Sequence, residues 1–234
     1  MARPRVSVLY GSQTGNSSQA AQDFCKSLDG AAGNPMELDD WLVLDPTKTQ
    51  NDTDIWIIFV SSYGVGGAPL GALQFRQVCD AILEEKQKPM LRGIRYAVCG
   101  LGNSNYTTYL NNPRTIFRAL QQAGATPLLE DVVACDAASD DQGEESIASF
   151  CTQAGAKLKT ILATEGDAAG TAPDRLLQVR TALQDTARRV VLDWNDTRSM
   201  PSSSGSNNSM SLLYLLLALL VVAIAYIIGT NRAE

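Results

Sequence analysis

Short runs rich in β-branched residues alternate with helical stretches from Arg5 to about Thr164. This alternation is typical of a parallel sheet covered by helices on both faces. We expect strands at Val6–Tyr10, Ile55–Ser61, Tyr96–Gly100 and Leu128–Cys135, with a weaker one within Met36–Leu44. We expect helices at Ser17–Leu28, Leu73–Glu85, Pro113–Ala123 and Glu144–Leu162. The pattern therefore predicts an α/β fold, a three-layer α/β/α sandwich with a five-stranded parallel sheet.

The residues that follow the expected domain, 1–164, differ from it in composition. Segment 165–194 starts with a linker rich in Gly, Ala and Thr and continues as Asp174–Trp194, where apolar residues recur at helical spacing. This amphipathic helix either packs onto the domain, or lies on a membrane surface or against a partner. Residues 195–211 include PSSSGSNNS and predict a flexible tether with a reach of about 22 Å.

The segment Leu212–Ile228 (LLYLLLALLVVAIAYII) contains no charged residue. With its neighbours it gives about 20 residues, or roughly 30 Å of helix, which is enough to cross a bilayer. A buried core helix is the alternative. A short tail, 229–234, follows, and the first residues lack the apolar core of a secretory signal. We expect a tail-anchored, single-pass protein in a lipid bilayer with its N-terminal domain in the cytosol. The tail carries one arginine, which favours the endoplasmic reticulum over the mitochondrial outer membrane.

Composition excludes several kinds of chemistry. The chain has no histidine, so it holds no Ser/His/Asp or Cys/His catalytic unit, and it offers no Cys/His cluster for zinc or iron-sulfur binding. Its five cysteines form no CxxC pair and are expected to be reduced thiols. The net charge of -6 argues against nucleic-acid binding. We therefore predict no catalytic side chain and no metal site, and expect any chemistry to come from a bound cofactor.

The loop after the first strand has the composition of a phosphate site. It reads Gly11-Ser12-Gln13-Thr14-Gly15-Asn16-Ser17, with hydroxyl, amide and glycine residues at the start of a helix. Backbone N–H groups and the helix dipole favour an anion there. The loop has no lysine, which argues against a P-loop NTPase and suits a phosphate monoester held by neutral donors. The alternative is an ordinary helix cap.

Two further loops at carboxyl ends of strands combine glycines with an aromatic residue. The first of these, Ser61–Pro69, contains Tyr63, and the other, Gly100–Tyr106, ends on Tyr106. Glycine lets the backbone approach a flat ligand, and a tyrosine ring can stack on it. Each tyrosine alone could be an ordinary loop aromatic. Since ligands of open parallel sheets bind at the carboxyl ends of strands, the three loops together indicate a site for a ring that carries a phosphate.

Three motifs resemble those of flavodoxin-like FMN domains. VLYGSQTGNSSQAA is similar to the flavodoxin phosphate signature, FVSSYGVGG to the tyrosine loop of diflavin reductases, and LRGIRYAVCGLGNSNY to the last FMN loop of those reductases and of wybutosine-synthesis tRNA enzymes. The resemblance covers residues 5 to 160. It implies that Ser12, Gln13, Thr14, Gly15, Asn16 and Ser17 bind the FMN phosphate. It also implies that Ser62, Tyr63 and Gly64 cover one face of the flavin ring, that Leu101, Gly102, Asn103 and Tyr106 cover the other, and that Asp136 lies near it.

The chain departs from this pattern where diflavin reductases read Tyr-Gly-Glu-Gly-Asp. Val65 and Gly67 stand in place of the two acids, so a docking face cannot be transferred from the reductases. With no NADPH or FAD domain in view, we expect a carrier of single electrons from an NAD(P)H-dependent reductase to a membrane haem or iron-sulfur protein. The alternatives are a membrane-anchored scaffold without FMN and an NAD(P)H:quinone reductase.

Overall fold

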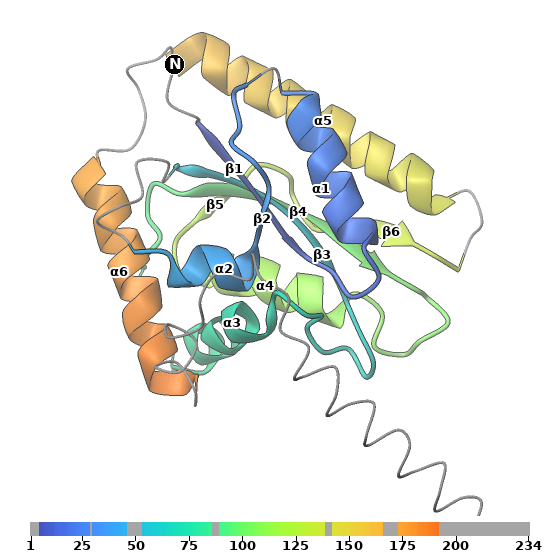
Figure 1. Ribbon diagram of the computed structural model, residues 1–234, viewed down its shortest axis with the longest axis horizontal. Helices are drawn as coiled ribbons and strands as arrows, with labels where there is room; N and C mark the ends of the chain where they lie inside the picture. Colours follow the sequence, from blue (N-terminus) through green and yellow to red (C-terminus); the bar gives the residue numbers. More distant parts are fainter. Residues whose placement is uncertain are drawn as a thin grey trace, which may run out of the picture. The chain divides into compact units, whose positions relative to one another are not determined.

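A computed structural model describes residues 5–28, 30–45, 53–85, 89–138, 142–165 and 173–191. A parallel sheet forms the middle layer, with strand order β2-β1-β3-β4-β5 and with β6 also paired to β4 (Figure 1). Its strands are β1 (Val6–Gly11), β2 (Met36–Glu37), β3 (Ile55–Ser61), β4 (Arg95–Gly102), β5 (Thr126–Pro127) and β6 (Val133–Asp136). The predicted α/β fold with a parallel sheet is confirmed.

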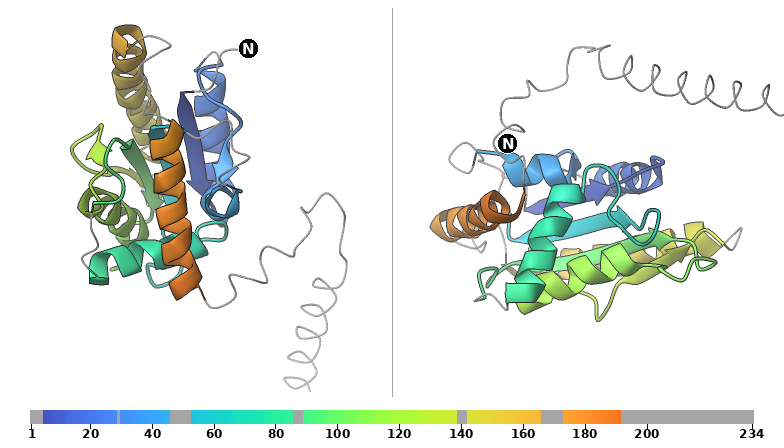
Figure 2. Two further views of the ribbon diagram at one scale, coloured as in Figure 1. Left: turned by 90° about the vertical axis from the view of Figure 1, so that its left-hand side faces the viewer. Right: turned by 90° about the horizontal axis from the view of Figure 1, so that it is seen from below.

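Helices cover both faces of the sheet (Figure 1, Figure 2). The chain forms α1 (Asn16–Lys26), α2 (Leu38–Val43), α3 (Leu73–Glu85), α4 (Asn111–Gln122), α5 (Gln142–Glu165) and α6 (Pro173–Val190). Helices α1 and α5 pack on one face, where Phe24, Phe59 and Phe150 are in contact. Helices α2, α3, α4 and α6 cover the other face. Strand β3 is buried on both sides, which explains why its apolar run is continuous rather than alternating.

The weaker strand predicted within Met36–Leu44 is confirmed as β2, whereas the strand predicted at Leu128–Cys135 needs correction. In the stretch Met36–Leu44 only the first two residues pair with β1, and α2 follows at once because Leu38, Trp41 and Leu42 turn into the core at helical spacing. Of the strand predicted at Leu128–Cys135, only Val133–Cys135 is strand, within β6, because β5 ends before this range at Pro127. Strands β5 and β6 both pair with β4, one after the other along its length. The described sheet therefore has six strands rather than five. Between β5 and β6, the exposed Glu130 and Asp131 lie in a bend that does not pair with the sheet.

Helix α6 belongs to the same compact unit as the sheet, which extends over Met1–Trp194. Its apolar face, which includes Val179, Leu183 and Ala187, is part of the core with α2 and α3. Arg180 is also buried there. Its guanidinium carbon lies 3.7 Å from the centre of the Trp41 ring, and Nη1 donates to the Trp41 carbonyl oxygen. The helix therefore packs onto the domain, which is the first of the two placements that its amphipathic pattern allowed.

We expect the Arg180→Ala variant to unfold more easily than the wild type. It loses a desolvated cation–π contact and leaves the Trp41 carbonyl without this donor, which together should cost about 3 kcal/mol and lower Tm by roughly 6–12 °C. Arg188→Ala is the control, because Arg188 is exposed on the same helix and pairs with the exposed Asp185. Thermal unfolding followed by circular dichroism measures both. Equal Tm values for the two variants would show that α6 does not depend on the Arg180 contact.

No helix among the described residues combines the length and the apolar character needed to cross a membrane. The predicted membrane helix Leu212–Ile228 lies outside the described residues. The same holds for the predicted tether, 195–211, and for the tail, 229–234.

Candidate functional site

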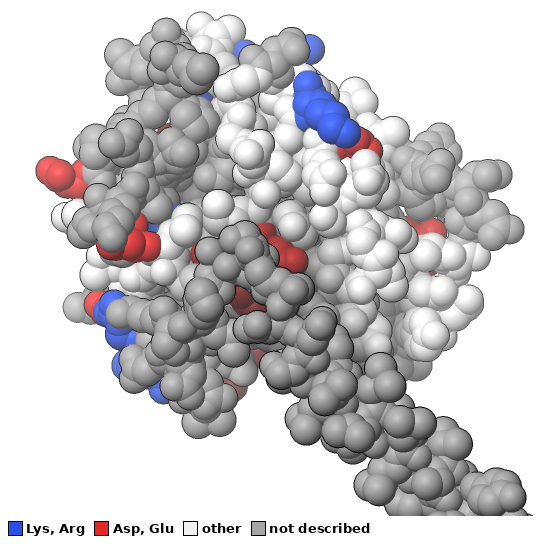
Figure 3. Space-filling view, in the orientation of Figure 1, with Lys and Arg blue, Asp and Glu red and all other residues white. Residues whose placement is uncertain are grey.

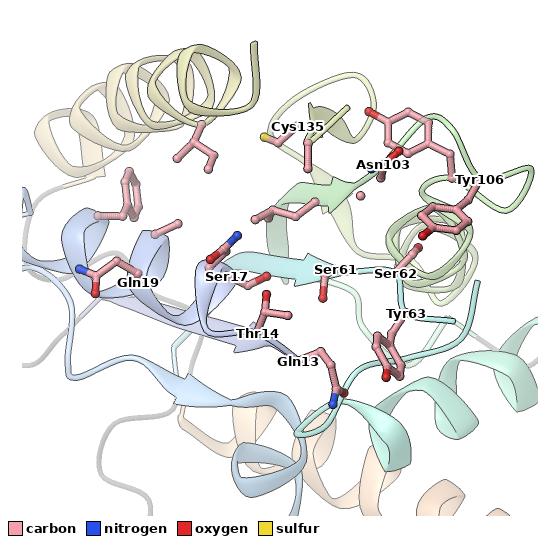
Figure 4. Close-up of a pocket in the computed structure, with 18 of the residues that line it drawn as sticks. Gln13, Thr14, Ser17, Gln19, Ser61, Ser62, Tyr63, Asn103, Tyr106 and Cys135 are labelled. Carbon is pink, nitrogen blue, oxygen red and sulfur yellow. The ribbon is translucent and has the colours of Figure 1, made fainter. Parts of the chain in front are cut away.

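A cavity of about 1000 Å³ lies where the loops after β1, β3 and β4 meet (Figure 4). Its size is at the upper end of the range for cofactor sites in proteins. Eleven of the predicted site residues line it: Gln13, Thr14, Asn16, Ser17, Ser62, Tyr63, Gly64, Leu101, Gly102, Asn103 and Tyr106. The cavity continues between α1 and α5, where Phe24 and Ile147 line it. The fold thus brings the three sequence-predicted loops to a single site.

The loop after β1 leads into the N-terminus of α1 at the cavity. Gly15 adopts a left-handed conformation with φ 96°, its N–H donates to Ser12 Oγ at 3.0 Å, and it precedes the first turn of α1. Within the described part of the chain, Ser17 Oγ is buried and has no hydrogen-bond partner. A buried hydroxyl without a partner is costly unless a ligand satisfies it. A phosphate at this helix N-terminus would do so, which means that these residues fit the FMN phosphate.

Ser12 and Gly15 do not line the cavity themselves. Ser12 shapes the turn, and its N–H donates to the Leu70 carbonyl oxygen at 3.3 Å. Gln13 Oε1 accepts from the Leu70 N–H, also at 3.3 Å. These two bonds join the phosphate loop to the loop after β3, so that the two loops keep one relative position.

The loop after β3 forms a short closed turn around its glycines. Tyr63 N–H donates to the Gly67 carbonyl oxygen at 3.0 Å, and Gly67 N–H donates back to Tyr63 at 2.9 Å. Gly64 and Gly66 have φ values of 57° and 84°, which favour glycine. The Tyr63 side chain is 54% exposed, and Tyr106 on the third loop is 63% exposed. In Figure 4 the two rings flank Ser62 at the rim of the cavity, which leaves them free to contact a flat ligand.

Two adjacent asparagines at the start of α4 hold the tyrosine loop in place. Asn112 is fully buried, donates from Nδ2 to the Ser61 carbonyl oxygen at 2.8 Å, and accepts from Arg76 at 3.2 Å. Its N–H donates to Ser62 Oγ at 3.1 Å, while Asn111 Nδ2 donates to the Gly66 carbonyl oxygen at 2.9 Å. The Ser62 hydroxyl therefore supports α4 as well as facing the cavity.

Leu110, directly before these asparagines, has φ 56° and is the non-glycine residue with positive φ among the described residues. Such a conformation costs on the order of 1 kcal/mol or more and persists where the surroundings impose it. We infer that the contacts of Asn111 and Asn112 with the tyrosine loop hold this strained connection.

Asp136 braces the third loop without lining the cavity. Its carboxylate accepts from the Ser104 and Ala138 N–H groups, each at 2.9 Å. Hydrogen bonds from Ser104 and then from Ala138 lower the pKa of this carboxyl group. Its neighbours Cys135 and Ala137 line the cavity instead. The structure therefore supports a positioning role for Asp136: it holds the loop Gly100–Tyr106 beside the part of the cavity that would take the flavin ring.

Sequence reasoning missed Tyr109, which also lines the cavity. Its ring packs so closely on Gly102 that a Cβ at this glycine would lie 2.9 Å from it. Tyr109 follows Tyr106 by three residues and could have been noticed in the sequence, but two aromatic rings already satisfied the predicted pattern. Tyr109 explains why the third loop needs a glycine at the end of β4.

The chain is similar in sequence to known flavoproteins. The chain is 32% identical over 165 residues to the sulfite reductase [NADPH] flavoprotein alpha-component of Aliivibrio fischeri, which is 70% of this chain and 26% of that protein. It is 32% identical over 164 residues to the protein of the same name from Photobacterium profundum, at 70% and 25% coverage. The chain thus spans about a quarter of the length of these relatives.

A solved flavodoxin from Pseudomonas aeruginosa, a cysteine-to-alanine variant, matches with a TM-score of 0.50 and 20% identity over 66% of this chain and 99% of its own. This likeness concerns the fold. The profile of the flavodoxin family matches residues 8–150, which is more than half of the sequence. The chain therefore belongs to the flavodoxin family, whose members bind FMN.

Proposed function

We propose that this protein is a membrane-anchored FMN carrier that takes single electrons from an NAD(P)H-dependent reductase and passes them to a membrane haem or iron-sulfur protein. The observation that carries the proposal is the single cavity that joins the buried, unpartnered Ser17 hydroxyl to the exposed Tyr63 and Tyr106 rings. One end suits a phosphate and the other a flat ring. FMN supplies the one-electron chemistry when bound.

The protein's own residues bind, orient and expose the cofactor. Thr14, Asn16 and Ser17 offer neutral donors to the phosphate, while Leu101 and Gly102 line the deeper wall. Tyr63 and Tyr106 cover the ring at the rim, where a partner protein can approach. The similar proteins carry NADPH and flavoprotein in their names, which supports an electron path that begins at NADPH.

The tyrosine loop and the start of α3 expose apolar side chains. Val65 is 92% exposed, Leu70 58% and Leu73 47%. Among the described residues in the view of Figure 3, acidic and basic side chains lie in several separate groups, with an acidic group near the middle of this face. We propose that redox partners dock here mainly through apolar contacts, so that their association depends little on ionic strength.

Restoring the two acids should make the final reduction of FMN harder. Two carboxylates on the order of 10 Å from the ring, in water, add roughly 0.8 kcal/mol of repulsion toward added negative charge, or about 35 mV. We therefore expect Val65→Glu/Gly67→Asp to lower the potential of the last reduction by about 20 to 40 mV. Gly30→Glu, which adds a charge on an exposed turn away from the cavity, is the control. Redox titration measures the potentials, and a rise or no change in the double variant would contradict the prediction.

We propose further that Leu212–Ile228 anchors the protein in a membrane with the flavodoxin domain in the cytosol, and that this membrane is the endoplasmic reticulum rather than the mitochondrial outer membrane. The uncharged apolar run and the single arginine after it support this placement. Membrane fractions washed at alkaline pH should retain the full chain. Release into the soluble fraction would contradict the anchor, and retention in mitochondrial fractions would contradict the choice of membrane.

Electron transfer can be tested with the purified full chain in detergent. We expect FMN-loaded protein to speed the reduction of a haem protein by NADPH and a flavin-containing NADPH reductase, in proportion to its concentration. The Gly15→Glu variant, treated with FMN in the same way, should not. Haem reduction at an unchanged rate would contradict the carrier, and if the chain also failed to bind FMN, the membrane-anchored scaffold would be the better proposal.

A further inference from the structure

Two thiols touch between neighbouring strands beside the cavity. Cys99 on β4 and Cys135 on β6 have their sulfur atoms 3.3 Å apart, and both side chains are buried. The register pairs Cys99 with Val133 and Leu101 with Cys135, so the cysteines are offset by two residues. Because side chains alternate along a strand, this offset places both on the same face, the one covered by α1 and α5.

The two thiols differ in access to the cavity. Cys135 lines it and is shown in Figure 4 with its sulfur at the wall, whereas Cys99 lies behind it in the sheet. A reagent that enters the cavity therefore meets Cys135 first. Cys79 is also buried, but it belongs to the core on the opposite face of the sheet and provides an internal control.

The contact also favours reactivity at Cys135. Hydrogen bonding from the Cys99 thiol lowers the pKa of Cys135, and the same contact raises the pKa of Cys99. Burial raises the pKa of Cys25 and of Cys151 to about 11. Since the thiolate is the nucleophile, this difference in pKa favours reaction at Cys135 over Cys151, which also lines the cavity.

We propose that Cys99 and Cys135 are an oxidisable thiol pair, open to peroxide through the cavity and shielded when FMN fills it. The Cys135 thiolate attacks one oxygen of hydrogen peroxide, giving a sulfenic acid and hydroxide. The Cys99 sulfur then attacks the Cys135 sulfur, so that the S–O bond breaks, the S–S bond forms, and the hydroxyl leaves as water with the Cys99 proton. Peroxide takes up the two electrons that the thiols lose.

The bridge requires a movement that the structure can accommodate. A disulfide has its sulfurs about 2.05 Å apart, so the pair must close by roughly 1.3 Å. Strand β6 has four residues and, among the described strands, pairs only with β4, so it can take up this shift. It ends at Asp136, which holds the third loop through Ser104. Oxidation therefore changes the wall of the cavity next to the ring site.

The first test maps the bridge in the full chain without FMN. After peroxide treatment, trypsin leaves Cys99 on peptide 96–114 but Cys135 and Cys151 together on 119–157, so a second cleavage at Glu144 or Glu145 separates them. Unreduced digests should contain a Cys99–Cys135 cross-link, lost in Cys99→Ser and retained in Cys79→Ser. In Cys99→Ser, a sulfenic acid trap should label Cys135. A cross-link to Cys151, or none in the wild type, would overturn the pair.

The second test concerns shielding, which rests on the proposed function. With saturating FMN, whose binding is measured separately by absorption, we expect cross-linking to slow by at least about tenfold, because the route to the thiolate is filled. If FMN binds and the rate of cross-linking is unchanged, the proposed shielding is wrong. If FMN does not bind but the cross-link forms, the thiol pair is upheld while the shielding and the FMN carrier both fail.

Discussion

Gly15→Glu should strongly weaken FMN binding while leaving the protein folded. The new carboxylate would stand at the N-terminus of α1 beside the donors of Thr14 and Ser17. At about 4 Å from a phosphate and in a partly screened site, the repulsion is on the order of 2 to 4 kcal/mol, or roughly 30- to 1000-fold in Kd. Fluorescence titration of FMN into the purified chain measures this loss.

The chain offers a matched control for the backbone. Gly15 and Gly30 have φ 96° and 84°, and no atom lies within 4 Å of a Cβ built on either. Gly30→Glu therefore carries the same backbone strain and the same charge at a site outside the cavity lining. We expect Gly30→Glu to bind FMN like the wild type. Equal losses in the two variants would mean that strain rather than the phosphate site is responsible.

Asn112→Ala should weaken both the fold and the FMN site. The substitution removes the donor to the Ser61 carbonyl oxygen and the acceptor for Arg76, both in a buried position. We expect a loss of about 2 to 4 kcal/mol in the free energy of unfolding. Because Ser61 leads into the tyrosine loop, we also expect FMN to bind roughly 10- to 100-fold more weakly at a temperature where the variant remains folded.

The control for this variant is Asn34→Ala, since Asn34 is exposed before β2. Urea unfolding gives the stability, and FMN titration of the folded fraction gives the affinity. An Asn112→Ala protein that lost stability but bound FMN normally would limit Asn112 to a structural role. An unchanged stability would contradict the buried contacts themselves.

Local sequence patterns predicted the parts of the site that depend on local chemistry. The glycine and hydroxyl residues from Ser12 to Ser17 and the loops that carry Tyr63 and Tyr106 follow directly from strand ends and turn residues. Their meeting at one cavity follows from the parallel sheet, because the carboxyl ends of its strands share one edge.

The features that were missed depend on contacts between distant segments. The Asn112 contacts join residues about fifty positions apart, and Arg180 meets Trp41 across an even longer separation. A buried arginine on an amphipathic helix looks like a surface residue in sequence, because its helical spacing alone does not show that a tryptophan ring will cover it. The division of the fifth strand into β5 and β6 likewise depends on how residues 128–132 leave the sheet.

The most direct test of the proposed site is the visible absorption of the purified full chain before and after FMN is added and unbound flavin removed. We predict flavin bands at equimolar stoichiometry, with the fluorescence of bound FMN quenched by stacking on Tyr63 and Tyr106. Colourless protein that leaves the fluorescence of added FMN unchanged would contradict the FMN carrier.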